Sequence, residues 1–330
     1  MSTIRFGIVG LGTHGTRYAN HLSAGDVEGA TLSAVCRRNV EAGEAYAKEH
    51  GAAFFADSNE LVTGNVDAVV IATPVADHLP AAEAAAAAGK HVLVEKPMGR
   101  NVAECKAIVD ACDQAGVKLM VGQSFRYNAL VAEMRRRLPD LGKVVQMCLS
   151  QRQDPTKTAW HHSLQAAGGG NMLENGVHLF DAARWMTGQE VVSAYCEIDH
   201  LAGQETEDAF AAILDLSDGC RCTVDACKFT KSRFAEIQIV GEEGQLIGSP
   251  SCNTLFMVQG RDVTPIDPPA PVPGLPCELG DFVSAIANDS EPFITGRDGL
   301  AAVAIACACY ASAQTRSAVA VNMEHSRPRL

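Results

Sequence analysis

The sequence predicts an α/β protein of two parts, a doubly wound parallel sheet followed by a domain built on an antiparallel sheet. Three observations support this prediction. The first 125 residues alternate short β-branched runs with helical stretches, whereas later strands follow one another and alternate apolar with polar residues. A glycine-rich turn comes directly after the first strand. The chain, at 330 residues, is also longer than one hydrophobic core usually supports.

The N-terminal strands are short apolar runs, which is typical of parallel strands that are buried on both faces. They cover residues 4–10, 31–36, 52–56, 66–73, 91–95 and 118–123. Helical stretches separate these runs, and each stretch ends near a glycine, where helices commonly stop. This alternation predicts a parallel sheet that carries helices on both faces. We assign this domain to residues 1–124.

The second domain is assigned to residues 125–330, where the pattern changes. Strand-like runs such as "VVSAYCEIDH", "CRCTVDACKF" and "AEIQIVGEEGQLIG" follow one another, and their period-two alternation predicts an antiparallel sheet with helices on one face. Helices are expected around residues 129–138, 277–288 and 298–314, the last two after a Pro-rich loop at 265–276.

Composition restricts the class of partner. The chain has 39 acidic and 27 basic residues, so it lacks the positive surface that nucleic-acid binding requires. No apolar stretch approaches the roughly 20 residues that cross a bilayer. Its twelve cysteines form no C-x-x-C pair, which favours reduced thiols in a cytoplasm over disulfides or a zinc site. We expect a cytoplasmic protein that binds a small molecule, with no metal, membrane or nucleic acid.

The segment "GIVGLGTHGTRYA" places Gly10, Gly12 and Gly15 in G-x-G-x-x-G spacing between a strand and a helix. In this context Gly10 makes the tight turn, Gly12 admits the pyrophosphate of a dinucleotide, and Gly15 lets helix and strand approach. Thr13 and His14 fall at the start of the helix and are expected beside the same cofactor. A tight turn that binds no ligand is the alternative.

Arginines occupy the end of the second strand, where an NAD-specific site usually carries an acid for the ribose hydroxyls. The segment reads "AVCRRN", with Arg37 and Arg38 in that place and no carboxylate. Guanidinium groups pair with a 2′-phosphate or stack on adenine, which favours NADP(H), while NAD(H) stays possible. Two solvated surface arginines are the alternative.

The segment "HVLVEKPMG" brings Glu95 and Lys96 to the carboxyl end of a buried strand. Carboxyl ends line the ligand crevice of a doubly wound sheet. A half-buried lysine there can donate a hydrogen bond to a substrate oxygen and tune proton transfer. A strand-end lysine that points into water is the alternative.

A second group of reactive residues lies in "GGGNMLENGVHLFDAARW", residues 168–185. Glu174 and His178 are four apart, so α-helical spacing would place them on one face. A carboxylate beside an imidazole orients the ring and raises its basicity, which suits a proton acceptor for an alcohol. The alternative is a carboxylate at the positive end of the helix dipole together with a core histidine.

These motifs together resemble those of the glucose-fructose oxidoreductase, inositol dehydrogenase and rhizopine catabolism family (Gfo/Idh/MocA). The matching segments are "GIVGLGTHG", "VVIATPVADH", "AGKHVLVEKPMG", "VGQSFRYN", "GGGNMLENGVHLFD" and "GRDGLAAVAIACACYASAQTRSAV". The resemblance implies an N-terminal Rossmann domain and a C-terminal α+β domain. It also implies that the second sheet is open, mainly antiparallel and a common subunit interface, as in a homodimer or homotetramer.

Carried over by position, Lys96 corresponds to the catalytic lysine of the "EKP" motif and His178 to the usual proton acceptor. The resemblance implies that Thr73, Pro74 and His78 border the nicotinamide half of the cofactor. Lys96 and His178 would handle the proton of the substrate hydroxyl group.

The resemblance also implies binding roles in the second part of the chain. Arg126, in "SFRYN", would lie near the substrate or a cofactor phosphate. Trp160 and His161 would sit in the substrate loop ahead of the three glycines.

This sequence departs from the family pattern in two places. Most relatives that have this pair of an acid and a histidine carry Asp where this chain has Glu174. A longer side chain must therefore hold the histidine or occupy substrate space. An aromatic and acidic segment seen in many inositol dehydrogenases is also missing. Lys231 and Arg233 stand there instead, which argues against myo-inositol and hints at an anionic or carbonyl-rich substrate.

The sequence thus predicts an NADP(H)-preferring oxidoreductase that acts on a sugar, polyol or related cyclic compound. Hydride would pass between the nicotinamide and a carbon that bears a hydroxyl or carbonyl group. Two alternatives share the fold. One is a dinucleotide-sensing regulatory protein without turnover, and the other is a glycosidase that uses a retained nicotinamide.

Overall fold

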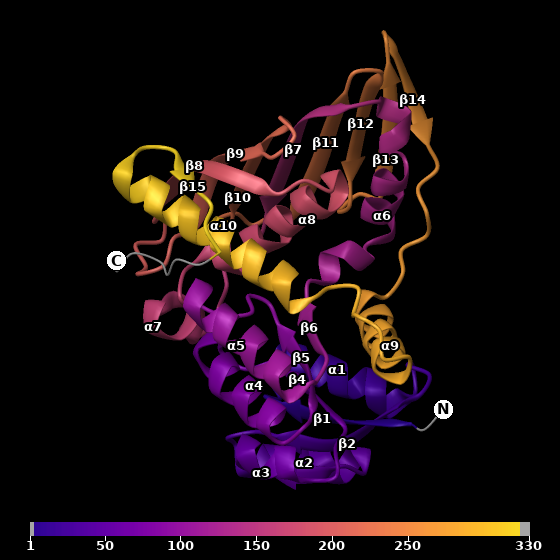
Figure 1. Cartoon of the computed structure of the whole chain (residues 1–330), viewed down its shortest axis with the longest axis vertical. Helices are drawn as coiled ribbons and strands as arrows, with labels where there is room; N and C mark the ends of the chain where they lie inside the picture. Colours follow the sequence, from indigo (N-terminus) through magenta and orange to yellow (C-terminus); the bar gives the residue numbers. More distant parts are fainter. Residues whose placement is uncertain (1–2, 324–330) are drawn as a thin grey trace. The chain divides into compact units, whose positions relative to one another are not determined.

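The computed structural model of the chain describes residues 3–323. The chain divides into two compact units (Figure 1). The first consists of the chain up to Gly99 together with Ala103–Ser124 and Pro273–Leu300. The second consists of Arg100–Val102, Phe125–Val272 and the chain from Ala301 onward.

The first unit contains a six-stranded sheet of order β3-β2-β1-β4-β5-β6, and every pairing in it is parallel. The strands are β1 (Ile4–Val9), β2 (Ala30–Cys36), β3 (Ala53–Phe55), β4 (Ala68–Ile71), β5 (His91–Glu95) and β6 (Leu119–Gly122). The helices between them are α1 (Thr13–Ala24), α2 (Val40–His50), α3 (Ser58–Thr63), α4 (His78–Ala87) and α5 (Val102–Ala115). The predicted doubly wound sheet is confirmed, and its strand order reverses at β1 and β4, where such sheets bind ligands.

Helix α9 (Gly274–Ala287) belongs to the first unit although it comes late in the chain. Its Phe282 is fully buried, with the ring 6.2 Å from that of Phe6 in β1. The division by contacts therefore differs from a single boundary at 124/125, because Pro273–Leu300 returns to the first unit. The sequence could not show this return, since the apolar face of a helix is compatible with either core.

The second unit contains a nine-stranded sheet of order β14-β13-β12-β11-β7-β10-β9-β8-β15. Its strands are β7 (Val144–Arg152), β8 (Val191–Asp199), β9 (Ala209–Leu216), β10 (Arg221–Cys227), β11 (Phe234–Gly241), β12 (Gly244–Ser249), β13 (Thr254–Gln259), β14 (Asp262–Ile266) and β15 (Val319–Ala320). Strands β7 and β10 pair in parallel and the other neighbours pair antiparallel, so the sheet is mixed. The sequence analysis did not anticipate the hairpin of β13 and β14, which ends the sheet on one side.

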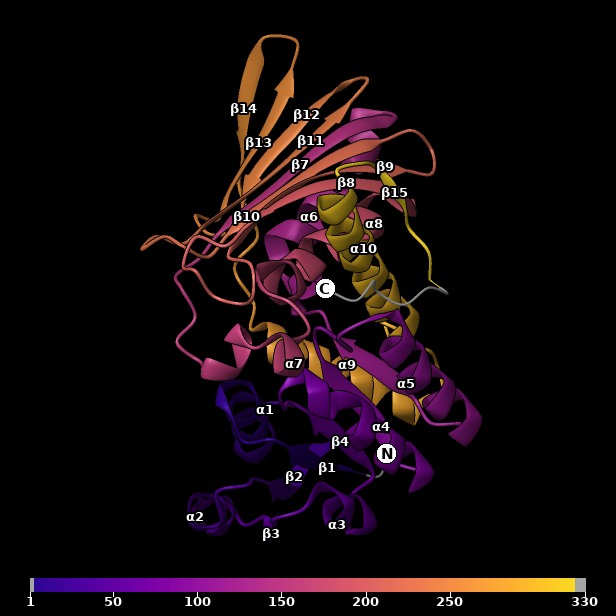
Figure 2. The same cartoon turned by 90° about the vertical axis from the view of Figure 1, so that its left-hand side faces the viewer.

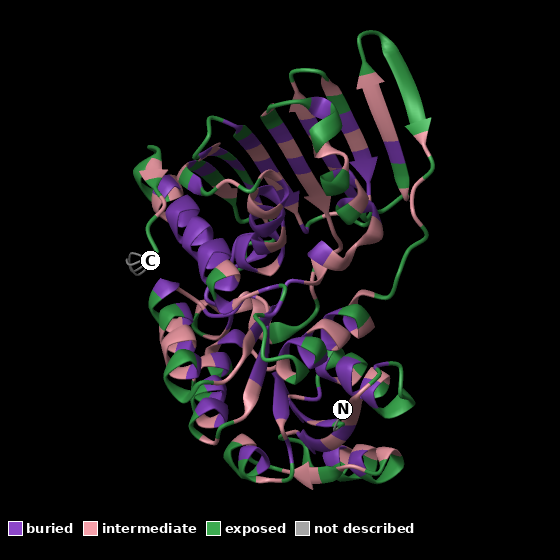
Figure 3. Ribbon diagram, turned by 45° about the vertical axis from the view of Figure 1, so that its right-hand side comes forward, coloured by how far each residue is buried: buried purple, intermediate pink, exposed green. Residues whose placement is uncertain are grey.

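Helices cover one face of this sheet (Figure 2). They are α6 (Ala129–Arg136), α8 (Val177–Thr187) and α10 (Gly296–Thr315), and a short α7 (Leu164–Ala167) lies in the loop before α8. Buried and more exposed residues alternate along the strands, which confirms the predicted period (Figure 3). The face turned toward the helices is apolar, with Leu149, Leu214 and Val224 almost fully buried.

Two further predictions concern the membrane and the cysteines. No helix within residues 3–323 is long and apolar enough to cross a membrane. All twelve cysteines are free thiols, and most of them are buried. Burial raises the pKa of the Cys112 thiol to about 12, so this side chain packs as a small neutral group.

Candidate functional site

In the glycine turn between β1 and α1, only one of the three motif glycines has free space around it. Gly10 has a φ of 97°, and a Cβ on it would lie 2.7 Å from the Ala72 carbonyl oxygen. A Cβ on Gly15 would lie 1.8 Å from the Gly10 carbonyl oxygen, so helix and turn touch there. A Cβ on Gly12 would meet nothing within 4 Å. The turn therefore has the free space that an approaching pyrophosphate needs.

Helix α1 begins beside this space at Thr13, and no side chain caps its N-terminus. Its first amide groups are thus available to an anion. Thr13 and His14 are exposed there, and His14 Nδ1 lies 3.6 Å from Glu95 Oε1.

The two arginines follow β2 directly, as predicted. Arg37 is half-buried and Arg38 is exposed. Asn39 ends the loop by capping α2, where its side chain accepts a hydrogen bond from the Ala42 amide. Within residues 3–323 no carboxylate forms an ion pair with either guanidinium group, so both can take an anionic ligand.

Thr73 and His78 have different environments after β4. The Thr73 hydroxyl oxygen is buried and lacks a hydrogen-bond partner within the described chain. A buried hydroxyl without a partner is costly, which suits a position where a bound cofactor supplies the missing group. Pro74 follows it at the start of a short turn into α4.

His78, expected beside the nicotinamide half of the cofactor, is buried, with its ring 1% exposed. Its Nε2 lies 3.0 Å from the Thr73 carbonyl oxygen, and its Nδ1 lies 3.1 Å from the Pro97 carbonyl oxygen. Burial lowers the pKa of His78. The ring thus joins the chain after β4 to the chain after β5 and positions both segments.

The end of β5 carries Glu95 and Lys96. Glu95 is 8% exposed, and its Oε2 accepts a hydrogen bond of 3.0 Å from the Lys96 amide. Its Oε1 accepts one of 3.1 Å from the Tyr18 hydroxyl of α1. Lys96 is half-buried and precedes Pro97 through a cis peptide bond. The carboxylate thus lies behind the lysine and holds its backbone.

The three glycines of the second unit are required by close contacts. A Cβ on Gly168 would lie 2.5 Å from Arg100 Cβ, and one on Gly169 would lie 2.1 Å from the Tyr310 hydroxyl oxygen. A Cβ on Gly170 would lie 2.1 Å from the Glu207 carbonyl oxygen. This crowding fixes the course of the chain into the next helix.

Glu207 anchors the same segment and was missed by the sequence analysis. It is 1% exposed, and its carboxylate accepts hydrogen bonds from the amides of Gly170 and Met172 at 2.8 and 2.9 Å. The Tyr310 hydroxyl donates to it at 2.7 Å. An acidic residue just before a strand has no sequence pattern that predicts this role, because its partners are more than 30 residues away.

The helix that follows does not have the regular spacing that we expected. Residues Met172–Gly176 form a π-helical turn, and α8 begins only at Val177. The α-helical rule that placed Glu174 and His178 on one face therefore fails across this segment. His178 is half-buried at the start of α8, with its ring centroid 6.2 Å from that of Phe125.

The carboxylate of Glu174 lies beside a lysine and a histidine from other segments. Its Oε2 lies 2.9 Å from Lys228 Nζ and 3.6 Å from His161 Nδ1. Lys228 comes directly after β10, and its side chain is 2% exposed. A buried ammonium that pairs with a partly exposed carboxylate keeps that carboxylate fixed and charged.

Lys228 also corrects the sequence-based view of the nearby cations. Arg233, taken earlier as a hint of an anionic substrate, forms an exposed ion pair of 2.7 Å with Asp154. Lys231 is exposed. The signal that could have revealed Lys228 is a lone lysine at the end of an apolar strand, because such a residue needs a buried acid.

Trp160 and His161 lie in the loop before α7, as expected. Their rings stack with centroids 3.7 Å apart and planes 25° from parallel. Because His161 also contacts Glu174, the stacked pair, the carboxylate and Lys228 form one group in the second unit.

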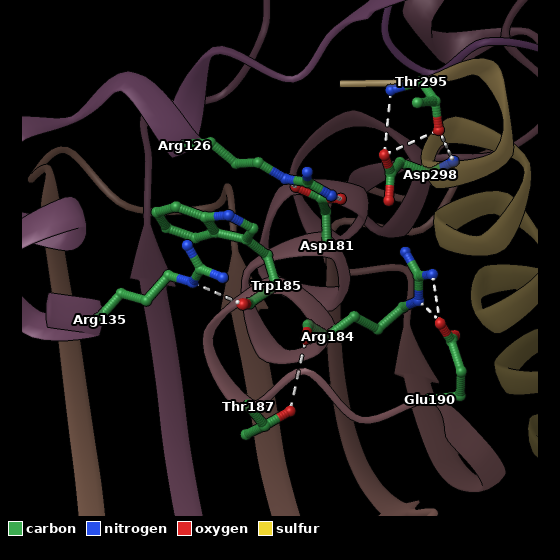
Figure 4. A network of polar contacts seen from close by, with 9 residues as sticks. All are labelled: Arg126, Arg135, Asp181, Arg184, Trp185, Thr187, Glu190, Thr295 and Asp298. Atoms are coloured by element: carbon green, nitrogen blue, oxygen red, sulfur yellow. Dashed lines mark hydrogen bonds and ion pairs between the residues drawn. The ribbon is translucent and has the colours of Figure 1, made fainter. Parts of the chain in front are cut away.

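Arg126, expected near the substrate or a cofactor phosphate, lies in a buried environment with an acidic partner. It is 6% exposed, and its guanidinium group donates two hydrogen bonds to the Asp181 carboxylate at 2.8 and 2.6 Å. Trp185 has both Arg126 and Arg135 over its ring, at 5.9 and 4.6 Å (Figure 4). A bidentate, buried ion pair of this kind joins the segment after β6 to α8.

The structure thus brings some of the predicted residues together in each unit. In the first unit the glycine turn, Thr73, Glu95 and Lys96 lie at the carboxyl edge of the parallel sheet. In the second unit Trp160 stacks on His161, and His161 and Lys228 both lie beside Glu174. Within residues 3–323 no three His, Cys, Asp or Glu side chains gather in a group that could hold a metal ion.

Comparisons with known proteins identify the family of this chain. A family model described as "Oxidoreductase family, NAD-binding Rossmann fold" matches residues 4–123, and one for the GFO/IDH/MocA C-terminal domain matches residues 134–247. The chain belongs to the GFO/IDH/MocA family. The predicted family is therefore confirmed, and so is its class of enzyme, a nicotinamide-dependent dehydrogenase or reductase.

Individual relatives extend over almost the whole chain. A 1,5-anhydro-D-fructose reductase of Ensifer adhaerens is 28% identical and covers 96% of this chain and 98% of its own length. An inositol 2-dehydrogenase of Rhizobium meliloti is 27% identical, and the match covers 97% of this chain and 99% of that enzyme. Among solved structures, an aldose-aldose oxidoreductase from Caulobacter crescentus complexed with glycerol has a TM-score of 0.88. It is 27% identical, with 96% and 99% covered.

The buried pair of Lys228 and Glu174 generates a stability prediction. Lys228→Met should lower the free energy of unfolding by about 3 kcal/mol, because it leaves a carboxylate without its buried partner. The double variant Lys228→Met/Glu174→Gln should recover most of that loss, because the unpaired charge is then gone. Chemical denaturation measures both changes.

Arg233→Met is the matched control, since it breaks an exposed ion pair and should cost less than about 1 kcal/mol. If Lys228→Met cost no more than this control, the pair would not be a buried structural contact.

Proposed function

We propose that this chain is an NADP(H)-preferring oxidoreductase that acts on a sugar, polyol or related cyclic compound. Hydride passes between the nicotinamide and a substrate carbon that bears a hydroxyl or carbonyl group. One observation carries the proposal. The open glycine turn, the half-buried Lys96 and the buried Thr73 hydroxyl, which has no hydrogen-bond partner within the described chain, all lie at the carboxyl edge of the parallel sheet. The names of the relatives support the substrate class, because they are sugar and inositol dehydrogenases or reductases.

The first unit supplies the cofactor-binding part of the mechanism. The free space at Gly12 and the uncapped amides of α1 bind the pyrophosphate, and Thr73 offers its hydroxyl to the nicotinamide half. A bound nicotinamide accepts or donates the hydride. The residues of the chain bind and orient it.

Lys96 and His178 act on the hydroxyl or carbonyl group of the substrate. The ammonium group of Lys96 donates a hydrogen bond to the substrate oxygen that becomes a carbonyl or a hydroxyl. The imidazole of His178 accepts the hydroxyl proton during oxidation and returns it during reduction. Glu95 acts behind Lys96 by holding its amide, so it is a positioning residue.

Glu174 has a binding role in this proposal. Lys228 and His161 fix its carboxylate, which can then accept hydrogen bonds from substrate hydroxyls. Because the charges of Glu174 and Lys228 compensate each other, the group favours a neutral polyhydroxy compound over an anionic one. This replaces the hint of an anionic substrate that Lys231 and Arg233 gave.

Quaternary structure and compartment complete the proposal. The uncovered face of the nine-stranded sheet carries a row of Tyr195, Ile213, Thr223 and Cys148, paired in register across β8, β9, β10 and β7. Tyr195 and Ile213 are 36% and 44% exposed, and this mixed face is suited to a homodimer or homotetramer interface. Twelve free thiols favour the reducing cytoplasm.

The proposed proton chemistry predicts a specific loss of turnover. With NADP⁺ or NADPH and a panel of sugars, inositols and their keto forms, Lys96→Ala and His178→Ala should each lower kcat by about 10²- to 10⁴-fold. Absorbance of the reduced nicotinamide follows the reaction.

Lys48→Ala, on the exposed side of α2, is the matched control and should keep wild-type turnover. Undiminished kcat in the Lys96 or His178 variant would remove the corresponding role from the mechanism.

The proposed preference for NADP(H) can be tested through the dissociation constants of the two cofactors. Wild-type protein should bind NADP⁺ more tightly than NAD⁺, and Arg38→Asp should weaken NADP⁺ binding by about 10- to 100-fold, because a charge-assisted hydrogen bond is lost. Isothermal titration calorimetry gives both dissociation constants.

Arg261→Asp changes an exposed arginine of the second unit by the same charge and should leave both constants unchanged. A wild-type preference for NAD⁺ would contradict the assignment of Arg37 and Arg38 to a 2′-phosphate.

A further inference from the structure

A buried cluster of acids lies behind the proposed lysine, and the mechanism above does not use it. The Tyr18 hydroxyl of α1 lies 2.5 Å from Glu278 Oε1 of α9 and 3.1 Å from Glu95 Oε1 of β5. Tyr18 and Glu278 are fully buried, and Glu95 is 8% exposed. The three residues come from elements far apart in the sequence and belong to the same unit.

The number of protons decides the charge of this cluster. Three oxygen atoms in a row make two hydrogen-bond contacts, and each contact needs one proton. Tyr18 supplies one proton, so a carboxyl group must supply the other. Two charged carboxylates facing one hydroxyl would also repel each other in a buried site.

The surroundings indicate which carboxyl carries the proton. Glu95 is stabilised as a carboxylate, because it accepts the Lys96 amide and lies 3.6 Å from His14 Nδ1. Glu278 has no such support, since its Oε2 is buried and lacks a hydrogen-bond partner within the described chain. A neutral carbonyl oxygen tolerates that position far better than a charged one.

We propose that Glu278 is a buried carboxylic acid that donates its proton to Tyr18, which in turn donates to the Glu95 carboxylate. The chain of donors ends at the carboxylate that holds the Lys96 amide. Glu278 and Tyr18 are thus positioning residues that keep Glu95 charged and oriented behind Lys96. The effect on turnover rests on the proposed function, whereas the proton on Glu278 does not.

The groups that face the cluster agree with this assignment. Tyr18 and His14 approach from α1, Glu95 and Lys96 from β5, and Gly122 borders the carboxylate from the end of β6. Burial lowers the pKa of His78, on α4, and the charge of Glu95 acts on that pKa in the opposite direction. Burial and the Glu95 charge raise the pKa of Glu278 well above its ordinary value, and burial raises that of Tyr18.

The direction of the pH dependence follows from this raised pKa. Between the ordinary glutamate pKa and the folded-state pKa of Glu278, the folded protein binds one proton more than the unfolded chain. The free energy of unfolding therefore falls as pH rises through that range. When the proton leaves, a second charge appears beside Glu95 and disturbs the support of Lys96.

Infrared spectroscopy of the whole protein at neutral pH tests the proton directly. The wild type should show the carbonyl stretch of a protonated carboxylic acid, and Glu278→Gln should lose it, because an amide replaces the acid at nearly the same size. Glu83→Gln, on the exposed side of α4, is the matched control and should keep the band. No band in the wild type, or a band that persists in Glu278→Gln, overturns the proposal.

Two further readouts separate positioning from packing. Tyr18→Phe should shift the band, because the acid loses its acceptor, and an unchanged band would overturn the proposed donor chain. In the pH profile of kcat, the wild type should lose activity on the alkaline side, and Glu278→Gln should lack that fall. An identical alkaline fall in both proteins would remove Glu278 from the support of Lys96. If no turnover is found at all, the infrared result still decides the proton.

Discussion

The hydrogen bonds of one buried carboxylate, Glu95, organise the carboxyl edge of the parallel sheet. This side chain accepts the Lys96 amide and the Tyr18 hydroxyl, so it ties the end of β5 to α1. A charge at the edge of a core is costly unless hydrogen bonds satisfy it. Here the donors come from the segments that must be aligned for a lysine and a glycine turn to face one ligand. The hydrogen bonds from these donors offset the cost of burying the charge.

The neighbouring contacts extend the same constraint. The buried His78 ring lies between the carbonyl groups of Thr73 and Pro97 and packs against both the chain after β4 and the chain after β5. The second unit uses similar means, since Glu207 holds the three-glycine segment and Lys228 holds Glu174. In both units the reactive side chains are half-buried, whereas the groups that hold them are almost fully buried. Such support keeps an exposed reactive group in place.

Local pattern predicted a large share of the fold. The parallel sheet, the mainly antiparallel sheet and the Rossmann glycine turn all have short-range signals, because hydrophobic period and turn residues act over a few positions. The return of α9 to the first unit and the hairpin of β13 and β14 lacked such signals. The π-helical turn at Met172–Gly176 also escaped, because its sequence reads as an ordinary helix.

The same limit applies to the candidate site. Motifs singled out Gly12, Lys96 and His178 as candidates, whereas contacts with partners far away in the sequence could not be predicted. Arg126 was expected near the substrate or a cofactor phosphate, and its buried ion pair with Asp181 was not anticipated. Lys228 and Glu278 were not singled out, because each gains its meaning from an acid or hydroxyl more than 50 residues away.

Titration of ¹⁵N-labelled protein with NADP⁺, followed through the backbone amide resonances, tests the central claim most directly. If the sheet edge around Glu95 binds the dinucleotide, the amides of Gly12 and Lys96 shift together with one dissociation constant, while that of Arg261 stays in place. Saturating cofactor that leaves the Gly12 and Lys96 amides unmoved would contradict the account.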